Sequence, residues 1–171
     1  MGRSWKKDTI TFVKKFRTNS VKETQKVGER IGKRLKAGDV VALEGPLGAG
    51  KTTLVKGIAK GLGVKDKKAV VSPTFVLIHE YEARERIYHM DWYRLSKVEG
   101  QDRLQAEEYF NSKGITLVEW ADRGKAIFPK SHIRILLKYD GPERRIIEVH
   151  GMKNETISLR HLKRGLERRD L

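Results

Sequence analysis

The sequence contains no cysteine among its 171 residues, which excludes disulfides and thiolate metal sites. It also lacks any run of about 18 successive apolar residues, the length that a membrane-spanning helix needs. Its first residues carry charge rather than the apolar stretch of a signal peptide. We therefore expect a cytoplasmic protein that does not enter a membrane. The length suffices for one domain with a proper core and is too short for two ordinary ones.

Acidic residues are scarce relative to basic ones. The 22 Asp and Glu stand against 37 Lys and Arg, which gives a formal net charge of +15. Such a charge is typical of a protein that meets a polyanion or an acidic partner. Charged residues of both signs nevertheless make up 35% of the chain, and an ion-pair-rich surface like that of thermophile proteins fits this composition equally well. The charge alone does not choose between nucleic-acid binding and a solvated surface.

Apolar patterns predict a series of strands. The polarity of residues 9–16 alternates as in a half-buried strand. Two continuous apolar runs, 39–45 and 115–120, are typical of strands buried on both faces. Strand-like runs around turn sequences predict two further pairs as hairpins, 75–81 with 86–91 and 132–139 with 144–151.

Helices are predicted between these strands. Ser20 and Glu23 have the spacing of a capping box, and an apolar stripe at helical spacing then runs to Leu35 before Gly38 stops it. The other predicted helices cover 51–62 and 103–110, and residues 158–171 form a basic helix or a frayed tail after a single domain over 1–157. Together the elements predict an α/β, P-loop NTPase-like three-layer sandwich, in which a mixed sheet has a parallel core, antiparallel hairpin edges and helices on both faces.

The strongest motif is GPLGAGKT, which has the phosphate-binding pattern G-x-x-x-x-G-K-T between a predicted buried strand and a predicted helix. Its glycines allow backbone amides to curl around nucleotide phosphates, and the helix directs its positive end at them. Lys51 is expected to neutralise the β and γ oxygens, and the Thr52 hydroxyl to hold Mg²⁺. The motif therefore predicts a magnesium-nucleotide site.

Magnesium held by one hydroxyl needs a carboxylate opposite, which P-loop proteins supply from the end of a neighbouring strand. Two predicted strands end in an acid, at Asp91 and at Glu119. One acid fits a metal contact and the other a group that orients or deprotonates the attacking water, but spacing does not assign the two roles. Thr74 lies in a loop that fits either a switch over the γ-phosphate or a plain turn. His89 is either a neighbour of this site or an ordinary strand histidine.

The segments GPLGAGKTT, SPTF, HMDWYRL and LVEW, in this order, closely resemble the TsaE family (formerly YjeE), small ATPases of bacterial tRNA threonylcarbamoyladenosine modification. The resemblance runs from about Ser20 to Pro129. It implies that Thr52 and Glu119 serve Mg²⁺, and that Asp91 is an acid needed for ATP hydrolysis. By the same resemblance Lys51, Asp91 and Glu119 are catalytic, and the residues at the nucleotide are Gly45, Gly48, Ala49, Gly50, Lys51, Thr52, Thr53 and Thr74.

Members of this family work with two related proteins, TsaB and TsaD, the second of which transfers the threonylcarbamoyl group to adenosine 37 of tRNA. The resemblance implies that ATP hydrolysis by this chain resets or activates the TsaB–TsaD complex, and that tRNA is reached through that complex. The chain departs from the family pattern at Leu104 and Gln105, where the family tends to place a Leu-Gly pair.

Two other functions stay open. A small-molecule kinase would share the P-loop, and a basic module that binds nucleic acid and uses ATP as a ligand would account for the charge. No N-K-x-D guanine signature is found, although no residue positively selects adenine. Arg94 is the one candidate for an arginine finger, and a surface or ion-pair role fits it equally well. Without such an arginine, turnover by the isolated protein is expected to be slow.

Overall fold

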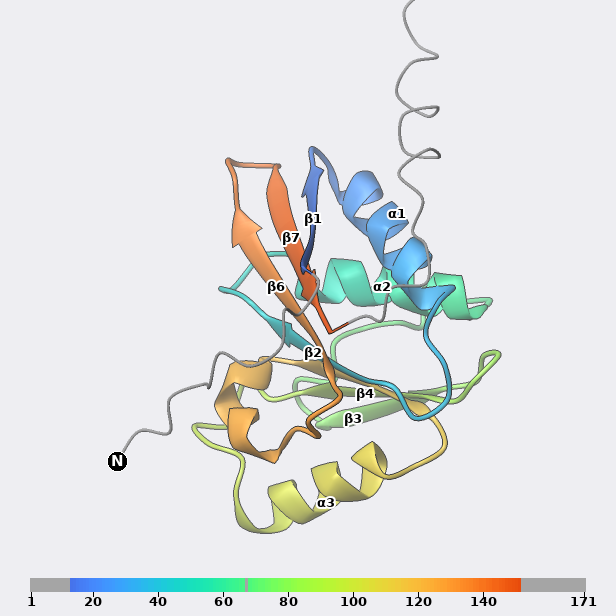
Figure 1. Cartoon of the computed structure of the whole chain (residues 1–171), viewed down its shortest axis with the longest axis vertical. Coiled ribbons are helices and arrows are strands. Elements are labelled where there is room, and N and C mark those ends of the chain that lie inside the picture. The colour runs from blue at the N-terminus through green and yellow to red at the C-terminus, as the bar shows by residue number, and fades with distance from the viewer. Residues whose placement is uncertain (1–12, 67, 152–171) are drawn as a thin grey trace, which may run out of the picture.

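The structure is a computed structural model, which describes residues 13–66 and 68–151. These residues form strands and helices in alternation (Figure 1). In chain order the elements are β1 Val13–Thr18, α1 Val21–Gly32, β2 Val40–Glu44, α2 Lys51–Leu62, β3 Ile78–Tyr81, β4 Ile87–Asp91, α3 Gly100–Phe110, β5 Ile115–Glu119, the 3₁₀ helix η1 Ala121–Ile127, β6 Ile133–Tyr139 and β7 Arg145–His150.

The strands form one seven-stranded sheet in the order β1-β7-β6-β2-β5-β4-β3. The four central strands β6, β2, β5 and β4 are parallel, whereas β3 and β7 pair antiparallel with β4 and β6. The predicted mixed sheet with a parallel core is confirmed. The second hairpin differs from the prediction, because β6 belongs to the parallel core and β1 covers β7, so that β1 rather than β7 is the edge strand.

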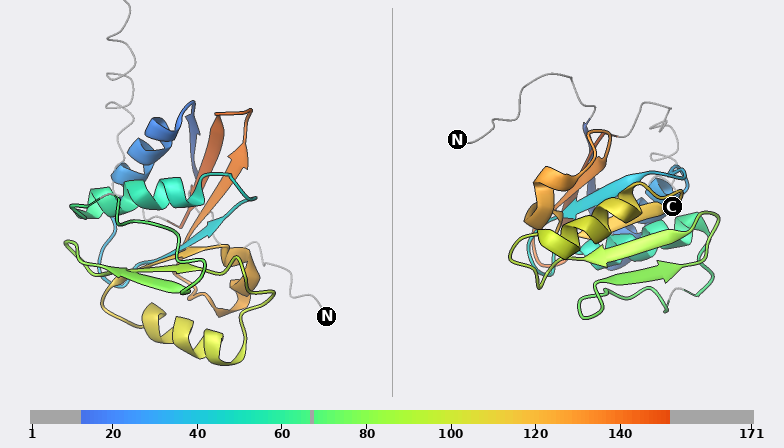
Figure 2. Two further views of the ribbon diagram at one scale, coloured as in Figure 1. Left: turned by 180° about the vertical axis from the view of Figure 1, so that it is seen from behind. Right: turned by 90° about the horizontal axis from the view of Figure 1, so that it is seen from below.

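Helices cover both faces of the sheet, which confirms the predicted three layers. Helices α1 and α2 lie on one face and α3 with η1 on the other (Figure 2). The larger core lies under α1 and α2 and includes Ile31, Leu54 and Ile58. The smaller core lies under α3 and includes Trp92 and Phe110. The continuous apolar runs of β2 and β5 follow from this arrangement, because every residue of both strands is buried.

The first helix begins as predicted and ends early. The Ser20 hydroxyl accepts from the backbone N–H of Glu23 at 3.2 Å, while the Glu23 carboxylate accepts from the backbone N–H of Asn19 at 2.8 Å rather than from that of Ser20. The helix stops at Gly32 instead of continuing through Leu35. The Arg84 guanidinium donates to the Leu35 carbonyl at 2.9 Å and so provides a partner for backbone that has left the helix.

Helices α1 and α2 cross at very close range through two pairs of glycines spaced four residues apart. A Cβ added at Gly32 would lie 2.2 Å from the carbonyl oxygen of Ile58, and one at Gly57 would lie 2.2 Å from that of Gln25. Close helix packing therefore explains the glycines of the sequences GERIG (28–32) and GIAKG (57–61). Because α2 begins at the P-loop, this contact fixes the loop relative to the sheet.

We expect Gly32→Ala to destabilise the protein by about 3 kcal/mol, because the methyl group must displace backbone rather than a flexible side chain. Thermal unfolding measures this as a fall in Tm of roughly 10 °C. Gly38→Ala is the control: Gly38 has a φ of +86° but nothing within 4 Å of an added Cβ, so that substitution costs only backbone strain of about 1–2 kcal/mol. Equal losses in both variants would contradict the close-contact explanation.

Several predicted boundaries shift. Of the segment 75–81, only Ile78–Tyr81 is strand. The first strand is seen from Val13, and its predicted part before that residue lies outside the described residues, as does the predicted basic segment 158–171. The division into domains at residue 157 therefore stays a prediction. Within the described residues, no helix combines the length and apolarity needed to cross a membrane.

Candidate nucleotide-binding site

The predicted phosphate-binding motif lies between β2 and α2, as the sequence pattern requires. Gly50 caps the start of α2 with a φ of 99°, and Gly48 has a φ of 75°. Both values lie in the left-handed region that favours glycine, and they turn the chain sharply from the strand into the helix. The amino end of α2 carries no side-chain cap, so its backbone N–H groups have no side-chain acceptor and fit an anion.

Lys51, the first residue of α2, is 5% exposed. Its ammonium group donates to the carbonyls of Gly45 at 2.6 Å and Pro46 at 3.0 Å, and it lies 3.8 Å from the ring centroid of Trp120. Burial lowers the pKa of Lys51, while nearby carboxylates, that of Glu119 foremost, act in the opposite direction. The charge is thus already inside the loop that would hold phosphate, and its partners there are neutral.

Glu119 is the centre of a buried network at the end of β5. The Thr52 hydroxyl lies 2.9 and 2.8 Å from its two carboxylate oxygens. Nε2 of His89 lies 2.8 Å from Oε1 of the same carboxylate. Because a carboxylate only accepts, we assign the imidazole proton to Nε2. Nδ1 of His89 is buried with no partner among the described residues, which fits an unprotonated nitrogen better than an unpaired N–H.

This network settles an alternative that the sequence left open. His89 is fully buried, and it bonds Glu119 rather than a backbone group of the sheet. The two residues are diagonal neighbours on the parallel strands β4 and β5, because Glu119 lies two positions beyond Leu117, the register partner of His89. His89 is therefore a neighbour of the predicted metal position and holds the carboxylate of Glu119 in place.

The donor set fits magnesium. A hydroxyl and a carboxylate side by side are the hard oxygen ligands that Mg²⁺ takes, and Mg²⁺ usually completes its shell with phosphate oxygens and water. No cluster of three or more His, Cys, Asp or Glu side chains suited to a metal occurs in the described part of the chain. A cation at Thr52 and Glu119 would therefore need phosphate oxygens, as in a metal-nucleotide complex.

Asp91, at the end of β4, lies beside Glu119 in the sheet register. It is 3% exposed, and three groups donate to its carboxylate. These are the hydroxyl of Ser72, the hydroxyl of Thr74 at 3.0 Å and the backbone N–H of Tyr93 at 2.7 Å. The structure thus places Thr74 in contact with Asp91, and the sequence predicts both residues for this site. Ser72 is a further contact that the sequence reasoning did not single out.

Two residues other than glycine have positive φ within the described chain, and both adjoin these acids. Leu77, with a φ of 67°, ends the turn after Thr74, and its carbonyl accepts from the backbone N–H of Asp91 at 3.2 Å. Trp120, with a φ of 57°, follows Glu119 directly. Such conformations cost of order 1–3 kcal/mol each and gather at functional sites.

The outer wall of the P-loop comes from the β6–β7 hairpin, and sequence reasoning missed it. The Arg145 guanidinium donates to the carbonyls of Ala49 and Gly48, both at 3.2 Å. The Tyr139 hydroxyl donates to the carbonyl of Leu47, and the Arg145 guanidinium lies 4.6 Å from the Tyr139 ring. These contacts join residues more than 90 positions apart, so no local pattern could have indicated them.

A cavity of about 430 Å³ adjoins the same loop. Its lining comes from the P-loop and the start of α2, the start of α1, and the β6–β7 turn, and consists of Ser20, Val21, Lys22, Thr24, Gly48, Gly50, Thr53, Pro142, Glu143 and Arg145. The predicted nucleotide residues Gly48, Gly50 and Thr53 thus border one hollow. Arg94 lies elsewhere, with its guanidinium 5.0 Å from the ring centroid of Phe75.

Comparison with known proteins confirms the family that these motifs resemble. A family model described as "Threonylcarbamoyl adenosine biosynthesis protein TsaE" matches residues 18–147. The chain belongs to the TsaE family. One relative, "tRNA threonylcarbamoyladenosine biosynthesis protein TsaE" of Bacillus subtilis, is 41% identical over 141 residues, 82% of this chain and 87% of that protein. A protein of the same name from Treponema pallidum is 38% identical over 121 residues, 71% of this chain and 88% of the relative.

The fold agrees with the sequence match. A solved structure titled "Crystal structure of Bacillus subtilus YdiB" aligns with a TM-score of 0.69 at 34% identity, covering 92% of this chain and 99% of that one. The TsaE match extends past Pro129, where the resemblance read from the motifs stops, and so includes Tyr139 and Arg145. The departure from the family pattern at Leu104 and Gln105 lies within α3.

Proposed function

We propose that this TsaE family member binds ATP with Mg²⁺, hydrolyses it, and acts in the modification of tRNA to threonylcarbamoyladenosine. The observation that carries the proposal is the contact of Thr52 with Glu119 at 2.8–2.9 Å, with Lys51 buried in the same loop. A lysine, a hydroxyl and a strand-end carboxylate are the parts that a P-loop NTPase needs for phosphate and metal. The names of the relatives support the tRNA pathway.

Each of these residues has a defined task in the proposal. Mg²⁺ would neutralise charge on the phosphate oxygens, and Thr52 and Glu119 would hold it there. Lys51 would exchange the carbonyls of Gly45 and Pro46 for phosphate oxygens. The cavity bordered by Thr53 would take the nucleoside, because it opens directly beside the phosphate loop.

Asp91 would orient or deprotonate the attacking water. The hydroxyls of Ser72 and Thr74 donate to one oxygen of this carboxylate and the N–H of Tyr93 to the other, so the second oxygen keeps a lone pair for a water. The segment that carries Ser72 and Thr74 would act as a switch if these hydroxyl bonds change when nucleotide binds. In this proposal Glu119 holds the metal, and Asp91 acts on the attacking water.

We further propose that TsaB and TsaD dock around this site and raise its activity. Large apolar side chains are exposed beside it, namely Leu47 at 67%, Phe75 at 84%, Val76 at 61% and Tyr93 at 42%. Exposed apolar groups of this kind mark protein-binding surfaces. Arg94 stacks on Phe75. Arg145 does lie at the P-loop, but its guanidinium donates to the backbone carbonyls of Gly48 and Ala49, so the partners would supply the arginine finger.

The test is phosphate release from ATP by the purified protein. We expect slow release that stops when EDTA removes Mg²⁺ and that needs no hydroxyl acceptor. A small-molecule kinase would instead transfer the γ-phosphoryl group to an added hydroxyl acceptor and release ADP, with little free phosphate. No release under any condition, together with no binding of ATP, would contradict the proposal.

His89 offers a sharper check on the metal position. We expect His89→Ala to raise the Mg²⁺ concentration for half-maximal hydrolysis by about 10- to 100-fold, because Glu119 loses the group that orients it. Binding of Mn²⁺ with ATP, followed by electron paramagnetic resonance, should weaken in parallel. His89→Gln, which keeps a donor, should recover part of the affinity. If His89→Ala lowers only Tm and leaves metal dependence unchanged, the histidine is structural.

A further inference from the structure

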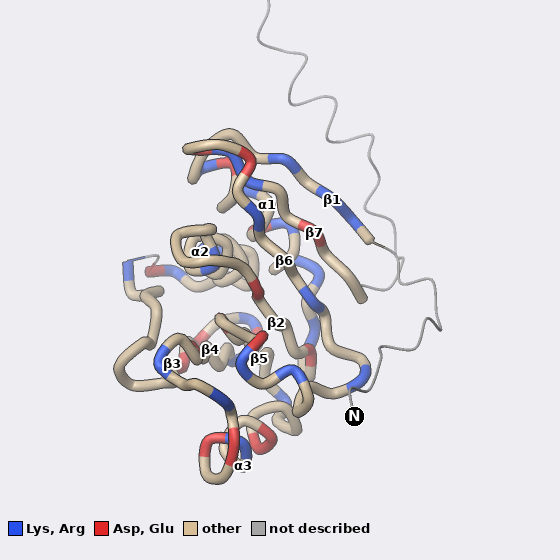
Figure 3. The backbone as a smooth tube through the Cα atoms, turned by 90° about the vertical axis from the view of Figure 1, so that its left-hand side faces the viewer, with Lys and Arg blue, Asp and Glu red and all other residues tan. Residues whose placement is uncertain are grey.

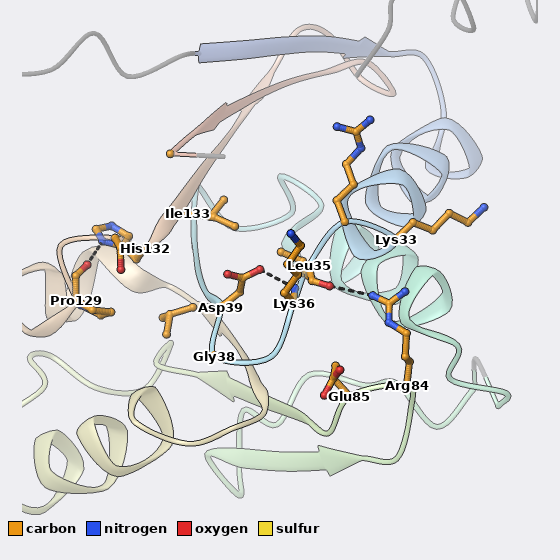
Figure 4. A pocket seen from close by; sticks show the side chains of 14 residues that line it. Lys33, Leu35, Lys36, Gly38, Asp39, Arg84, Glu85, Pro129, His132 and Ile133 are labelled. Atoms are coloured by element: carbon orange, nitrogen blue, oxygen red, sulfur yellow. Dashed lines mark hydrogen bonds between the residues drawn. The ribbon is translucent and has the colours of Figure 1, made fainter. Parts of the chain in front are cut away.

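Two further cavities share a wall. One, of about 660 Å³, lies at the amino ends of β2 and β6, and the other, of about 460 Å³, extends along the outer face of these strands. His132 and Gly151 line both. Figure 4 shows the larger one, with Asp39, Arg84 and His132 around it. Because β2 spans five residues, or about 16 Å, the larger cavity lies at the other end of the sheet from the nucleotide site.

Basic side chains dominate this double cavity, which we call the basic groove. The acidic side chains in its described lining are Asp39, Glu44 and Glu85. The Lys and Arg residues that define the groove are Lys33, Arg34, Lys36, Arg84, Lys125, Lys130 and Arg134. Figure 3, which marks Lys and Arg in blue, shows such positions recurring along the neighbouring β1 and β6.

The positive charge of the groove is not cancelled by its own acids. Glu44 is shared by two cations: it accepts from Arg134 at 2.7 and 2.8 Å and lies 3.6 Å from Lys125. Glu29, beside the groove, is likewise shared by Lys33 and Lys60. Hydrogen bonds from these two lysines lower the pKa of Glu29 to about 2. Glu44 therefore cannot neutralise both of its cations, and Glu29, which lies outside the lining, is likewise divided between two.

Other polar groups of the groove also lack acidic partners. The Arg84 guanidinium donates to the neutral carbonyls of Leu35 and Gly32, so its charge is unopposed by those contacts. Nε2 of His150, which lines the smaller cavity, is buried with no hydrogen-bond partner among the described residues. The groove thus offers surplus positive charge and an unused polar atom to an anionic ligand.

Both ends of the chain leave the described fold at this groove. Val13 pairs with His150 in the sheet, and Gly151 lines both cavities. The sequence beyond these points is basic, with Arg3, Lys6 and Lys7 before Val13 and Lys153, Arg160, Lys163, Arg164, Arg168 and Arg169 after Gly151, against Asp8, Glu155, Glu167 and Asp170. These two segments contribute nine basic and four acidic residues, or +5 of the net charge of +15.

We propose that the basic groove binds the sugar-phosphate backbone of an RNA, which for a protein of the proposed function is a tRNA. None of the exposed large apolar side chains of the described chain lines either cavity, which argues against a membrane. Phe128, the aromatic residue of the smaller cavity, packs on His132 with 5.1 Å between ring centroids. Because its ring is already in contact with His132, we expect the groove to bind phosphates rather than to stack with bases. RNA on this groove would leave the nucleotide site accessible to partners.

The experiment measures binding of a fluorescent tRNA to the full chain across a salt series, without nucleotide. Lys36→Glu with Lys130→Glu reverses two exposed charges in the groove, and Lys26→Glu with Lys97→Glu reverses two exposed charges elsewhere. We expect the groove variant to bind roughly tenfold or more weakly at about 0.1 M salt, with a flatter salt dependence. The matched control should stay within about twofold of the parent.

Three outcomes would overturn the inference: no tRNA binding by the parent, equal weakening in both variants, or a groove variant that keeps tRNA but loses the TsaB–TsaD complex. Equal weakening means that bulk charge alone attracts RNA, and loss of the complex means that the groove meets an acidic protein. Unchanged Tm in both variants excludes misfolding.

As a second measurement, bound tRNA should protect Lys36 and Lys130, but not Lys97, from acetylation. ATP hydrolysis is assayed separately and should be unchanged in both variants, so its failure would count against the proposed function alone.

Discussion

Lys51→Ala is expected to abolish measurable ATP binding and hydrolysis. The ammonium group lies inside the phosphate loop, 2.6 Å from the carbonyl of Gly45 and over the ring of Trp120. Without it, the loop loses the buried cation that would face the β and γ phosphates, while Arg145 stays bonded to the carbonyls of Gly48 and Ala49. A hydrogen bond between charged groups contributes about 1.5–3 kcal/mol, so the loss of one such contact alone weakens binding by about 10- to 100-fold. Calorimetric titration with ATP and Mg²⁺ measures the effect.

The control for this variant is Lys60→Ala on the same helix, where the lysine is exposed and pairs with Glu29. It should bind ATP as the parent does. Lys51→Ala should also keep its Tm, because it removes a charge that is buried among neutral carbonyls. A Lys51→Ala protein that hydrolyses ATP at the parental rate would rule out the P-loop as the phosphate site.

Asp91→Ala and Glu119→Ala are expected to spare much of the ATP affinity and to remove turnover. The two acids lie side by side at the ends of β4 and β5, but their partners differ: Thr52 and His89 for Glu119, and the loop hydroxyls of Ser72 and Thr74 for Asp91. Loss of a positioned acid or base lowers the rate by about 10²- to 10⁴-fold. Single-turnover hydrolysis beside nucleotide binding separates the two effects.

The metal dependence tells the acids apart. Excess Mg²⁺ should partly restore Glu119→Gln, since that variant loses a ligand, and should not restore Asp91→Asn, which keeps the shape of the side chain but cannot act on water. If Asp91→Ala hydrolyses ATP at the parental rate even with TsaB and TsaD present, the role given to Asp91 is wrong. If excess Mg²⁺ restores both variants equally, the proposed division of roles fails.

Much of the candidate site could be predicted because its parts have local signatures. The P-loop carries its own spacing, and both acids end short apolar strands. In a parallel sheet such strand ends meet at one edge, so the closeness of Asp91 and Glu119 follows once both strands are known to be parallel. Thr74 was indicated by its loop, and it does contact Asp91.

The rest depends on contacts that a linear pattern does not contain. Arg145 and Tyr139 reach the P-loop only because β6 pairs with β2, a pairing between strands almost 90 residues apart. The carbonyls at the early end of α1 find a donor in Arg84, which belongs to the loop before β4. The sequence does not distinguish His89 from an ordinary strand histidine. Alternation along β4 predicts which face of the sheet the side chain occupies, but not that Glu119 of β5 is its hydrogen-bond partner.

The close packing of α1 on α2 and the strained residues beside the acids suggest how the site is built. Glycine pairs fix the helix that begins at Lys51, while Leu77 and Trp120 hold unfavourable backbone next to Asp91 and Glu119. A rigid phosphate cradle thus faces a segment, around Ser72 and Thr74, that is held by a few hydroxyl contacts. This contrast fits an ATPase whose cycle a partner can control.

The most direct test of this account is the rate of phosphate release from ATP and Mg²⁺, measured for the protein alone and with TsaB, TsaD and tRNA. The account predicts slow release alone and stimulation of at least about tenfold, up to the roughly 10³-fold that a completed phosphoryl-transfer site can supply. Stimulation should vanish in Lys51→Ala and in Asp91→Ala. An equal rate with and without the partners would contradict it.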